Sequence, residues 1–217
     1  MTQITDAKIL ILSTNGFEQS ELERPLNDLK AKGATVHVAT PDGKDIKGWD
    51  KDDWGNTVAA DKALSDVTVG DYDAIVLPGG QINPDLLRAN KDAVSLIKSF
   101  ADAGKTVAAI CHAPWLLIEA GIIKGRAATS YASIATDVKN AGAHYEDSEV
   151  VVDQGIITSR SPEDLDAFIA KIVEEVEEEE HGKGADARCP RRRGRKRRGG
   201  VHHAPSAVAA LGGQARA

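Results

Sequence analysis

Unbroken apolar runs that alternate with helical patterns constrain the fold of this chain more than any other feature of its sequence. Such runs fall within Lys8–Leu12, Asp73–Leu77 and Lys105–Ile110, and they are typical of strands buried on both faces of a parallel sheet. Between the first two, residues 20–32 carry leucines at helical spacing. The alternation of strand and helix predicts an α/β domain with a doubly wound, mostly parallel sheet.

The same signals predict the remaining strands and helices. The polar, glycine-rich stretch at 41–57 is expected to form a hairpin. Further strands are predicted at 35–39, 126–129, 149–152 and 156–159, and further helices at 84–89, 91–103, 114–120 and from Pro162 onward. Ligands in such sheets bind at the carboxyl ends of the strands, so the residues that follow each strand are candidate site residues.

Charge divides the 217 residues into two unequal parts. Residues 1–181 hold 17 Lys and Arg against 32 Asp and Glu, a net of −15, whereas residues 182–217 hold 10 basic residues against a single acidic one, a net of +9. We predict an α/β domain over 1–176, followed over 177–217 by an acidic and then basic low-complexity tail that is disordered. The basic block 191–198 is open to two interpretations, a nucleic-acid or localisation arm and a solvated or even out-of-frame extension.

Composition and motifs exclude several functional classes. The acidic domain argues against nucleic acid as its main partner. The first residues lack the pattern of a signal peptide and no apolar stretch could span a bilayer, so no membrane partner is expected. Two cysteines make no disulfide framework, which favours a reducing, cytoplasmic location. No phosphate-binding or dinucleotide-binding glycine pattern and no paired metal-ligand spacing occurs, so neither a cofactor nor a metal is expected.

Cys111 is the sharpest chemical signal, because it follows a buried strand directly and precedes a predicted helix. A thiol there would face the N–H groups of the helix start, which stabilise a thiolate, and a tight turn would lift it to the top of the sheet. The alternative is a buried, inert cysteine. His112 comes next, but adjacent residues on a helix start point in different directions. A direct Cys111–His112 pair is therefore not expected, and His112 is predicted to face a subunit interface or the surface.

Two loops reach the same edge of the predicted sheet. Glu18 follows the first strand, where its carboxyl could exchange protons with a bound carbonyl compound or hydrogen-bond the cysteine sulfur. Glu21 fits better the role of an acidic residue that favours a helix start. Gly79 and Gly80 follow the third strand, and their backbone N–H groups form a candidate oxyanion hole, although a glycine pair is often just a turn.

Three aromatic side chains are candidate walls of a small pocket. They are Phe17, Trp115 and Tyr131, for which core packing is the alternative interpretation.

Taken together, Leu77–Gly80, Ala109–His112, Thr158–Leu165 and the early glutamate make the chain resemble the PfpI family. This family of intracellular cysteine peptidases and stress proteins, which includes deglycases and glyoxalases, is a branch of the class I glutamine amidotransferase-like superfamily. The resemblance runs from about Lys8 to Val176. It implies a flavodoxin-like three-layer α/β sandwich with a cysteine nucleophile elbow.

The resemblance also implies roles for individual residues. Cys111 would be the nucleophile, Glu18 its carboxylic-acid partner, and Gly80 with the His112 backbone the oxyanion hole. In peptidases of the family the histidine meets an acidic residue of a neighbouring subunit, which here would be Asp85. That arrangement implies a homo-oligomer, a dimer that builds to a hexamer.

The chain departs from the amidotransferases in one decisive place. They carry a later His-Pro-Glu whose histidine serves the nucleophile, whereas this chain has Arg160-Ser-Pro-Glu163. The glycines that flank their cysteine are Ala109 and Ala113 here. Glutamine amidotransfer is therefore not expected.

Three functions remain open. The favoured one is a cysteine-dependent glyoxalase or deglycase that acts on a small aldehyde such as methylglyoxal, or on its early glycation adducts. The second is an intracellular cysteine peptidase acting on peptides. The third is a redox-sensing or chaperone-like stress protein in which Cys111 is oxidised.

Overall fold

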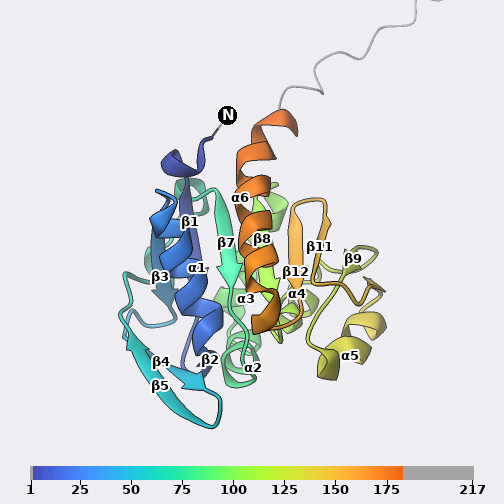
Figure 1. The fold of residues 1–217 in the computed structure, drawn as a ribbon, viewed down its shortest axis with the longest axis horizontal. Helices are drawn as coiled ribbons and strands as arrows, with labels where there is room; N and C mark the ends of the chain where they lie inside the picture. Colours follow the sequence, from blue (N-terminus) through green and yellow to red (C-terminus); the bar gives the residue numbers. More distant parts are fainter. Residues whose placement is uncertain (1, 183–217) are drawn as a thin grey trace, which may run out of the picture. The chain divides into compact units, whose positions relative to one another are not determined.

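A seven-stranded sheet forms the centre of the protein (Figure 1). The computed structural model describes residues 2–182. Within the sheet the strand order is β11-β12-β8-β7-β1-β3-β6, and every pair is parallel except β11 with β12. These strands are β1 (Lys8–Leu12), β3 (Thr35–Thr40), β6 (Lys62–Ala63), β7 (Ala74–Leu77), β8 (Thr106–Ile110), β11 (Val150–Asp153) and β12 (Ile156–Ser159). The predicted α/β class with a mostly parallel sheet is confirmed.

Helices cover both faces of this sheet. They are α1 (Gln19–Ala31), α2 (Ile82–Arg88), α3 (Lys91–Asp102), α4 (Pro114–Glu119), α5 (Ala135–Asn140) and α6 (Leu165–Gly182). Successive side chains of a strand point to opposite faces, and β1 shows this directly. Ile9 and Ile11 pack in one apolar cluster with residues of α1 and α6, whereas Leu10 and Leu12 pack in a second with residues of α3 and α4. The result is the expected three-layer sandwich.

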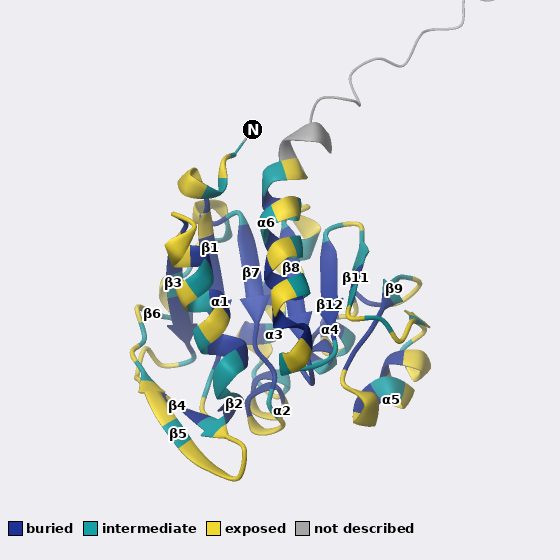
Figure 2. Cartoon of the chain, viewed as in Figure 1, coloured by how far each residue is buried: buried dark blue, intermediate teal, exposed yellow. Residues whose placement is uncertain are grey.

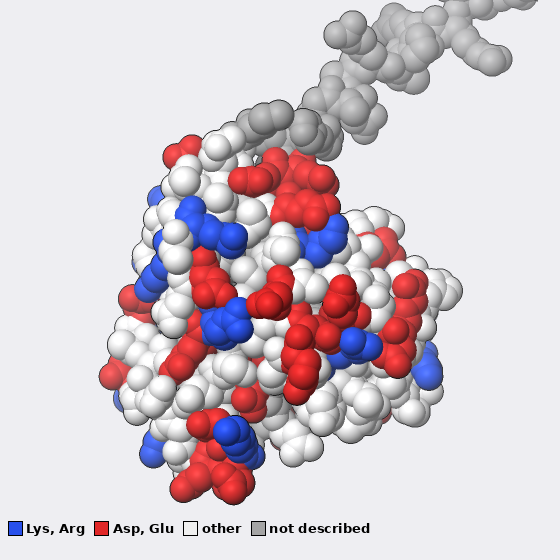
Figure 3. Space-filling model, in the orientation of Figure 1, with Lys and Arg blue, Asp and Glu red and all other residues white. Residues whose placement is uncertain are grey.

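Burial follows the same layering (Figure 2). The four residues of β7 and the five of β8 are all buried, because helices cover both sides of these strands. The outward faces of α1 and α6 are exposed, and Figure 3 shows acidic and basic side chains interspersed over this face. None of the helices described within residues 2–182 is long and apolar enough to cross a membrane.

A small side sheet flanks the carboxyl edge of the main one. The predicted hairpin is present as β4 (Ile46–Asp50) and β5 (Asp53–Val58), and β4 also pairs in parallel with β2 (Phe17–Glu18), which the sequence analysis missed. The predicted strand at 126–129 is reduced to β9 (Ala127–Ala128), which pairs with β10 (His144–Tyr145) outside the main sheet.

The last helix is longer than the predicted domain. It runs to Gly182, so the acidic run after position 176 continues the helix through its described residues. The basic part of the predicted tail, 183–217, lies outside the described residues, and its disorder stays a prediction.

Candidate active site

Cys111 occupies the elbow between β8 and α4, with a positive φ of 62°. A side chain other than glycine is rarely found in this region, and such strain persists only where the surroundings impose it. Hydrogen bonds on both sides impose it here. The Cys111 N–H donates to the carbonyl of Ser159 at 3.0 Å, and the Cys111 carbonyl accepts from the N–H of Tyr131 at 2.9 Å. The predicted elbow between strand and helix is therefore present, and the role of its thiol as a nucleophile stays a prediction.

A cavity of about 650 Å³ opens beside this cysteine. It lies at the carboxyl edge of the main sheet, where the loops after β1, β7, β8 and β12 meet. Its lining residues are Gly16, Glu18, Glu21, Trp49, Lys51, Gly80, Gln81, Ile82, Cys111, His112, Tyr131, Ser161, Pro162 and Glu163. The position agrees with the rule that ligands of parallel α/β sheets bind at the carboxyl ends of the strands.

The carboxyl group that contacts the sulfur belongs to Glu21, not to Glu18. The Glu21 side chain has no exposed surface and hydrogen-bonds the Cys111 sulfur. Its Oε2 also accepts from the N–H of Gly79 at 2.9 Å. Glu18 lies one helical turn earlier, lines the cavity, and accepts from the Ser20 hydroxyl at 3.3 Å. The prediction that Glu18 hydrogen-bonds the sulfur is wrong, because the first turn of α1 turns Glu21 inward.

Burial controls the charge of this pair. Removal from water raises the pKa of Glu21 to about 8, because desolvation disfavours the ionised carboxyl. Glu21 is therefore mainly a protonated acid at neutral pH. Burial likewise raises the pKa of the Cys111 thiol, and the backbone N–H groups of Gly80 and His112 oppose that rise by hydrogen-bonding the sulfur. One acid, one thiol and two fixed N–H donors thus converge on the same point.

The two glycines of the loop after β7 have different tasks. The N–H of Gly79 is used by Glu21, so the prediction that Gly79 belongs to the oxyanion hole is corrected. A Cβ on Gly79 would lie 2.7 Å from the Cβ of Cys111, so glycine is needed for close approach. Gly80 has a φ of 76° and a hydrogen bond to the sulfur, which keeps Gly80 and His112 as candidate donors to an oxyanion.

His112 contacts the cysteine directly, contrary to the expectation for neighbouring residues on a helix. Its Nδ1 lies 3.1 Å from the Cys111 sulfur. The helix begins only at Pro114, and the positive φ of Cys111 turns both side chains toward each other. His112 is buried rather than at the surface, and burial lowers the pKa of its imidazole. The ring is therefore neutral at pH 7 and able to accept a proton.

This arrangement of elbow, buried acid and glycine loop agrees with what comparison of the sequence finds. The family model described as the DJ-1/PfpI family matches residues 7–175. The chain belongs to the DJ-1/PfpI family. The resemblance drawn from the sequence motifs is thereby confirmed.

Relatives with names and a solved structure support the assignment. A deglycase of Thermococcus kodakarensis, TK1284, is 46% identical over 76% of this chain and 97% of its own length. Protein/nucleic acid deglycase 2 of Escherichia coli is 42% identical over 74% of this chain and 92% of its own. YraA of Bacillus subtilis, named a candidate cysteine protease, is 43% identical over 74% of this chain and 93% of its own length. The crystal structure of Drosophila melanogaster DJ-1beta superposes with a TM-score of 0.71 at 30% identity. The superposition covers 82% of this chain and 97% of the DJ-1beta chain.

Aromatic side chains of this family member lie differently from the prediction. Tyr131 lines the cavity and stacks on the His112 ring, with centroids 4.8 Å apart. Trp115 packs edge-on against the same ring at 5.3 Å but is not among the residues that line the cavity, so the prediction that it walls the pocket is wrong. Phe17 is fully buried in the core, so the prediction that it walls the pocket is wrong. Trp49 of the β4–β5 hairpin lines the cavity instead, which its polar surroundings in the sequence did not indicate.

Asp85 lies on α2 and is exposed, away from the residues that line the cavity. Within the chain it does not complete a triad with His112, whose Nε2 lies 3.1 Å from the hydroxyl of Ser133. A role for Asp85 in a neighbouring subunit stays a prediction. Arg160, which stands in place of the amidotransferase histidine, pairs with Asp164 and Asp147 at 2.8 Å each.

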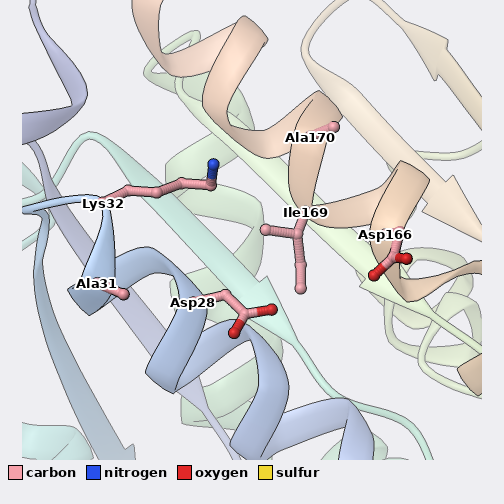
Figure 4. A pocket seen from close by; sticks show the side chains of 6 residues that line it. All are labelled: Asp28, Ala31, Lys32, Asp166, Ile169 and Ala170. Atoms are coloured by element: carbon pink, nitrogen blue, oxygen red, sulfur yellow. The ribbon is translucent and has the colours of Figure 1, made fainter.

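A second hollow within residues 2–182 differs from this site in its side chains. Figure 4 shows a hollow between α1 and α6 whose side chains include Asp28, Lys32 and Asp166. Arg24 bridges the two carboxylates beside it, at 3.1 Å from Asp28 and 2.8 Å from Asp166. These ion pairs join the two helices, and the residues that line the hollow include no cysteine, serine or histidine. Across residues 2–182, no group of three or more histidine, cysteine or acidic side chains is arranged to hold a metal ion.

Proposed function

We propose that the protein is a cysteine-dependent enzyme of carbonyl detoxification, acting as a glyoxalase or deglycase on methylglyoxal or its early glycation adducts. The observation that carries the proposal is the contact between the Cys111 thiol and the protonated carboxyl of Glu21. A thiol supplies the nucleophile for an aldehyde carbon. An acid whose pKa is about 8 can both give and take a proton near neutral pH.

The first step is addition of the thiol to the aldehyde. The His112 Nδ1, 3.1 Å from the sulfur, takes the thiol proton as the sulfur–carbon bond forms. The carbon–oxygen double bond opens, and the new alkoxide takes the proton of Glu21. Backbone N–H groups of Gly80 and His112 stabilise the negative charge as it develops. The product of this step is a hemithioacetal, with Glu21 ionised and His112 protonated.

The second step moves hydrogen between the two carbons. Ionised Glu21 removes the proton from the former aldehyde carbon while His112 protonates the neighbouring ketone oxygen, giving an enediol. Glu21 then returns a proton to the second carbon, and the remaining hydroxyl proton passes to His112. The first carbon is thereby oxidised to a thioester and the second reduced to an alcohol, so no external oxidant is needed.

Water completes the cycle. It attacks the thioester carbonyl and gives a proton to Glu21, while the thiolate leaves and takes a proton from His112. Methylglyoxal and water thus become lactic acid, and all three groups return to their starting forms. The Oε1 atom of Glu21 is buried and has no hydrogen-bond partner within residues 2–182.

The test is product analysis with methylglyoxal. We expect the parent protein to form lactate, Cys111→Ser and Glu21→Gln to form it at about a hundredth of the parent rate or less, and Glu18→Gln to keep most of the rate. Glu18 is the matched control because it lines the same cavity without contacting the sulfur. A folded parent that forms no lactate would rule out the glyoxalase function.

A purified adduct of methylglyoxal with N-acetylarginine separates the two carbonyl activities. Release faster than spontaneous dissociation, measured with a scavenger that removes free methylglyoxal, would support a deglycase. Release at the spontaneous rate would indicate that only the free aldehyde is a substrate. The names of the deglycase relatives support including this assay.

A peptidase is the second candidate, favoured by the contact between His112 and Cys111. Cys111 would attack an amide carbonyl, and His112 would protonate the leaving amine. We expect hydrolysis of an unstructured peptide to depend on His112 and, in an assembled oligomer, on Asp85. Equal hydrolysis by the parent and by His112→Ala would exclude this function.

A further inference from the structure

The His112 ring is held from both sides. Its Nδ1 lies 3.1 Å from the Cys111 sulfur, and its Nε2 lies 3.1 Å from the Oγ of Ser133. Cysteine, imidazole and hydroxyl therefore form a continuous row within one chain. Nothing in the sequence signals the third member, because Ser133 follows the cysteine by 22 positions in a short polar stretch.

The turn that carries Ser133 is anchored to the cysteine elbow itself. Ser133 lies in the middle of the 3-10 turn Ala132–Ile134. The turn is entered through Tyr131, whose N–H donates to the carbonyl of Cys111 at 2.9 Å and whose ring stacks on His112. It is closed by Ile134, whose N–H donates to the carbonyl of Tyr131 at 3.1 Å and whose side chain is buried. The backbone of Ser133 is thus placed by hydrogen bonds and packing, and its exposed hydroxyl contacts Nε2 of His112.

A serine hydroxyl suits both protonation states that the histidine must visit. When the neutral imidazole awaits the thiol proton at Nδ1, its other nitrogen carries the hydrogen and donates it to the serine oxygen. When the ring is protonated, the same Nε2–H still donates to Ser133, and Nδ1–H faces the thiolate. A hydroxyl can also donate to a bare Nε2, so the two contacts select the tautomer together: a thiol that donates toward Nδ1 leaves the ring hydrogen on Nε2, where the Ser133 oxygen accepts it.

We propose that Ser133 is a positioning residue that fixes the orientation and tautomer of His112, so that the row Cys111–His112–Ser133 is complete within a single subunit. The proposal extends the function proposed above, in which His112 takes and returns the thiol proton. It differs from the predicted arrangement in which the acid Asp85 of a neighbouring subunit orients this histidine, because a single ring nitrogen would have to serve both partners.

The primary experiment is nitrogen-15 NMR of the His112 ring in the full chain without substrate. In the parent we expect the tautomer with hydrogen on Nε2. In Ser133→Ala we expect the two tautomers to mix, and in Ser133→Thr, which keeps the hydroxyl, a return to the parent signal. Ser65→Ala is the matched control, because Ser65 is also an exposed serine in the middle of a 3-10 turn. It should leave the His112 signal unchanged.

Kinetics with methylglyoxal provide the second measurement. We expect Ser133→Ala to lower kcat by about three- to tenfold, the usual effect of one neutral hydrogen bond, with KM unchanged and partial recovery in Ser133→Thr. The pH below which the rate falls should also move to a lower value in Ser133→Ala, because the protonated imidazole of His112 loses a hydrogen-bond partner.

A Ser133→Ala protein whose His112 signals match those of the parent would overturn the proposal. If Asp85→Asn then changes these signals, the positioning role belongs to the neighbouring subunit. The NMR measurement needs no turnover, so a parent without methylglyoxal activity would count against the proposed function, and the ring signals alone would then decide the role of Ser133.

Discussion

The two sides of the cavity beside Cys111 are built in different ways. The inner wall is buried and consists of Glu21, Cys111 and His112, with Gly79 behind it donating its N–H to Glu21. The outer wall is half-buried or exposed; it consists of Glu18, Trp49, Lys51 and Glu163. The inner groups belong to the main sheet and its first helix turn, whereas two of the outer ones belong to the β4–β5 hairpin.

This difference assigns separate tasks to the two walls. Desolvation and fixed donors perturb the pKa values of the inner groups, which is what acid–base and nucleophilic chemistry needs. The outer groups keep contact with water, although burial also raises the pKa of Glu18. We therefore expect changes in the inner wall to act on kcat or on folding, and changes in the outer wall to act mainly on KM.

The largest effect is expected from Cys111→Ala. Without a nucleophile no hemithioacetal forms, so turnover of methylglyoxal should fall by about a thousandfold or more. The fold should survive, because the backbone bonds of Cys111 to Ser159 and Tyr131 do not involve the side chain. Circular dichroism and a lactate assay on the same preparation check both points. Residual lactate at more than about a tenth of the parent rate would contradict the role of the thiol.

The next largest effect is expected from Gly79→Ala, with Gly70→Ala as its control. A Cβ on Gly79 would lie 2.6 Å from Glu21 Oε2 and 2.7 Å from the Cβ of Cys111. Such overpacking should lower the free energy of unfolding by about 2–3 kcal/mol and separate the acid from the thiol. Gly70 lies in the 3-10 turn Val69–Asp71 with no atom within 4 Å of an added Cβ.

Urea unfolding and the lactate assay measure this pair of variants. We expect Gly70→Ala to match the parent in both. Equal stability of the two variants would mean that the inner wall adjusts to a methyl group, and the proposed rigidity would be wrong.

Glu21→Gln should lower the rate by about a hundredfold or more, the usual contribution of a positioned acid–base group. The same change should raise stability at alkaline pH. The folded-state pKa of Glu21, about 8, lies above the ordinary value of 4.5. Between these values the folded protein holds a proton that the unfolded chain has released, so the free energy of unfolding falls as pH rises from about 4.5 to 8.

The amide introduced by Glu21→Gln does not titrate in this range, so this pH dependence should be weaker in the variant. Thermal unfolding at pH 5 and pH 8 checks the sign: the parent should lose more stability than Glu21→Gln across this interval. An equal loss in both proteins would show that Glu21 is ionised in the folded state.

The central sheet could be predicted because burial on both faces leaves a direct trace in the sequence. The apolar run of Lys8–Leu12 and the one before Cys111 each became a strand with the predicted bounds or nearly so. Strand β2 and strand β6 left no such trace, because each is a two-residue element whose pairing depends on the tertiary fold.

The site shows the same division. The position of Cys111 followed from the strand before it, but the choice between Glu18 and Glu21 depended on which face of α1 meets the sheet. Helical spacing held the answer, since Glu21 shares a face with Pro25 and Leu29, which are buried. The contact of His112 with the thiol could not be derived, because it requires the positive φ of Cys111, a conformation imposed by distant hydrogen bonds.

The smallest effects are expected in the outer wall, where Trp49→Ala is the most informative change. Its ring lines the cavity, packs edge-on against Trp54 at 5.5 Å, and donates from Nε1 to the carbonyl of Lys51 at 2.8 Å. Removing it should raise KM for methylglyoxal by about two- to fivefold and leave kcat within about twofold, because no acid, base or nucleophile is touched. A larger adduct such as glycated N-acetylarginine should be affected more, since it extends farther along the hairpin.

Trp54→Ala, which removes the partner ring outside the cavity, is the control. A kcat loss in Trp49→Ala as large as that of Glu21→Gln would mean that the hairpin takes part in the chemistry, and the division between the two walls would fail.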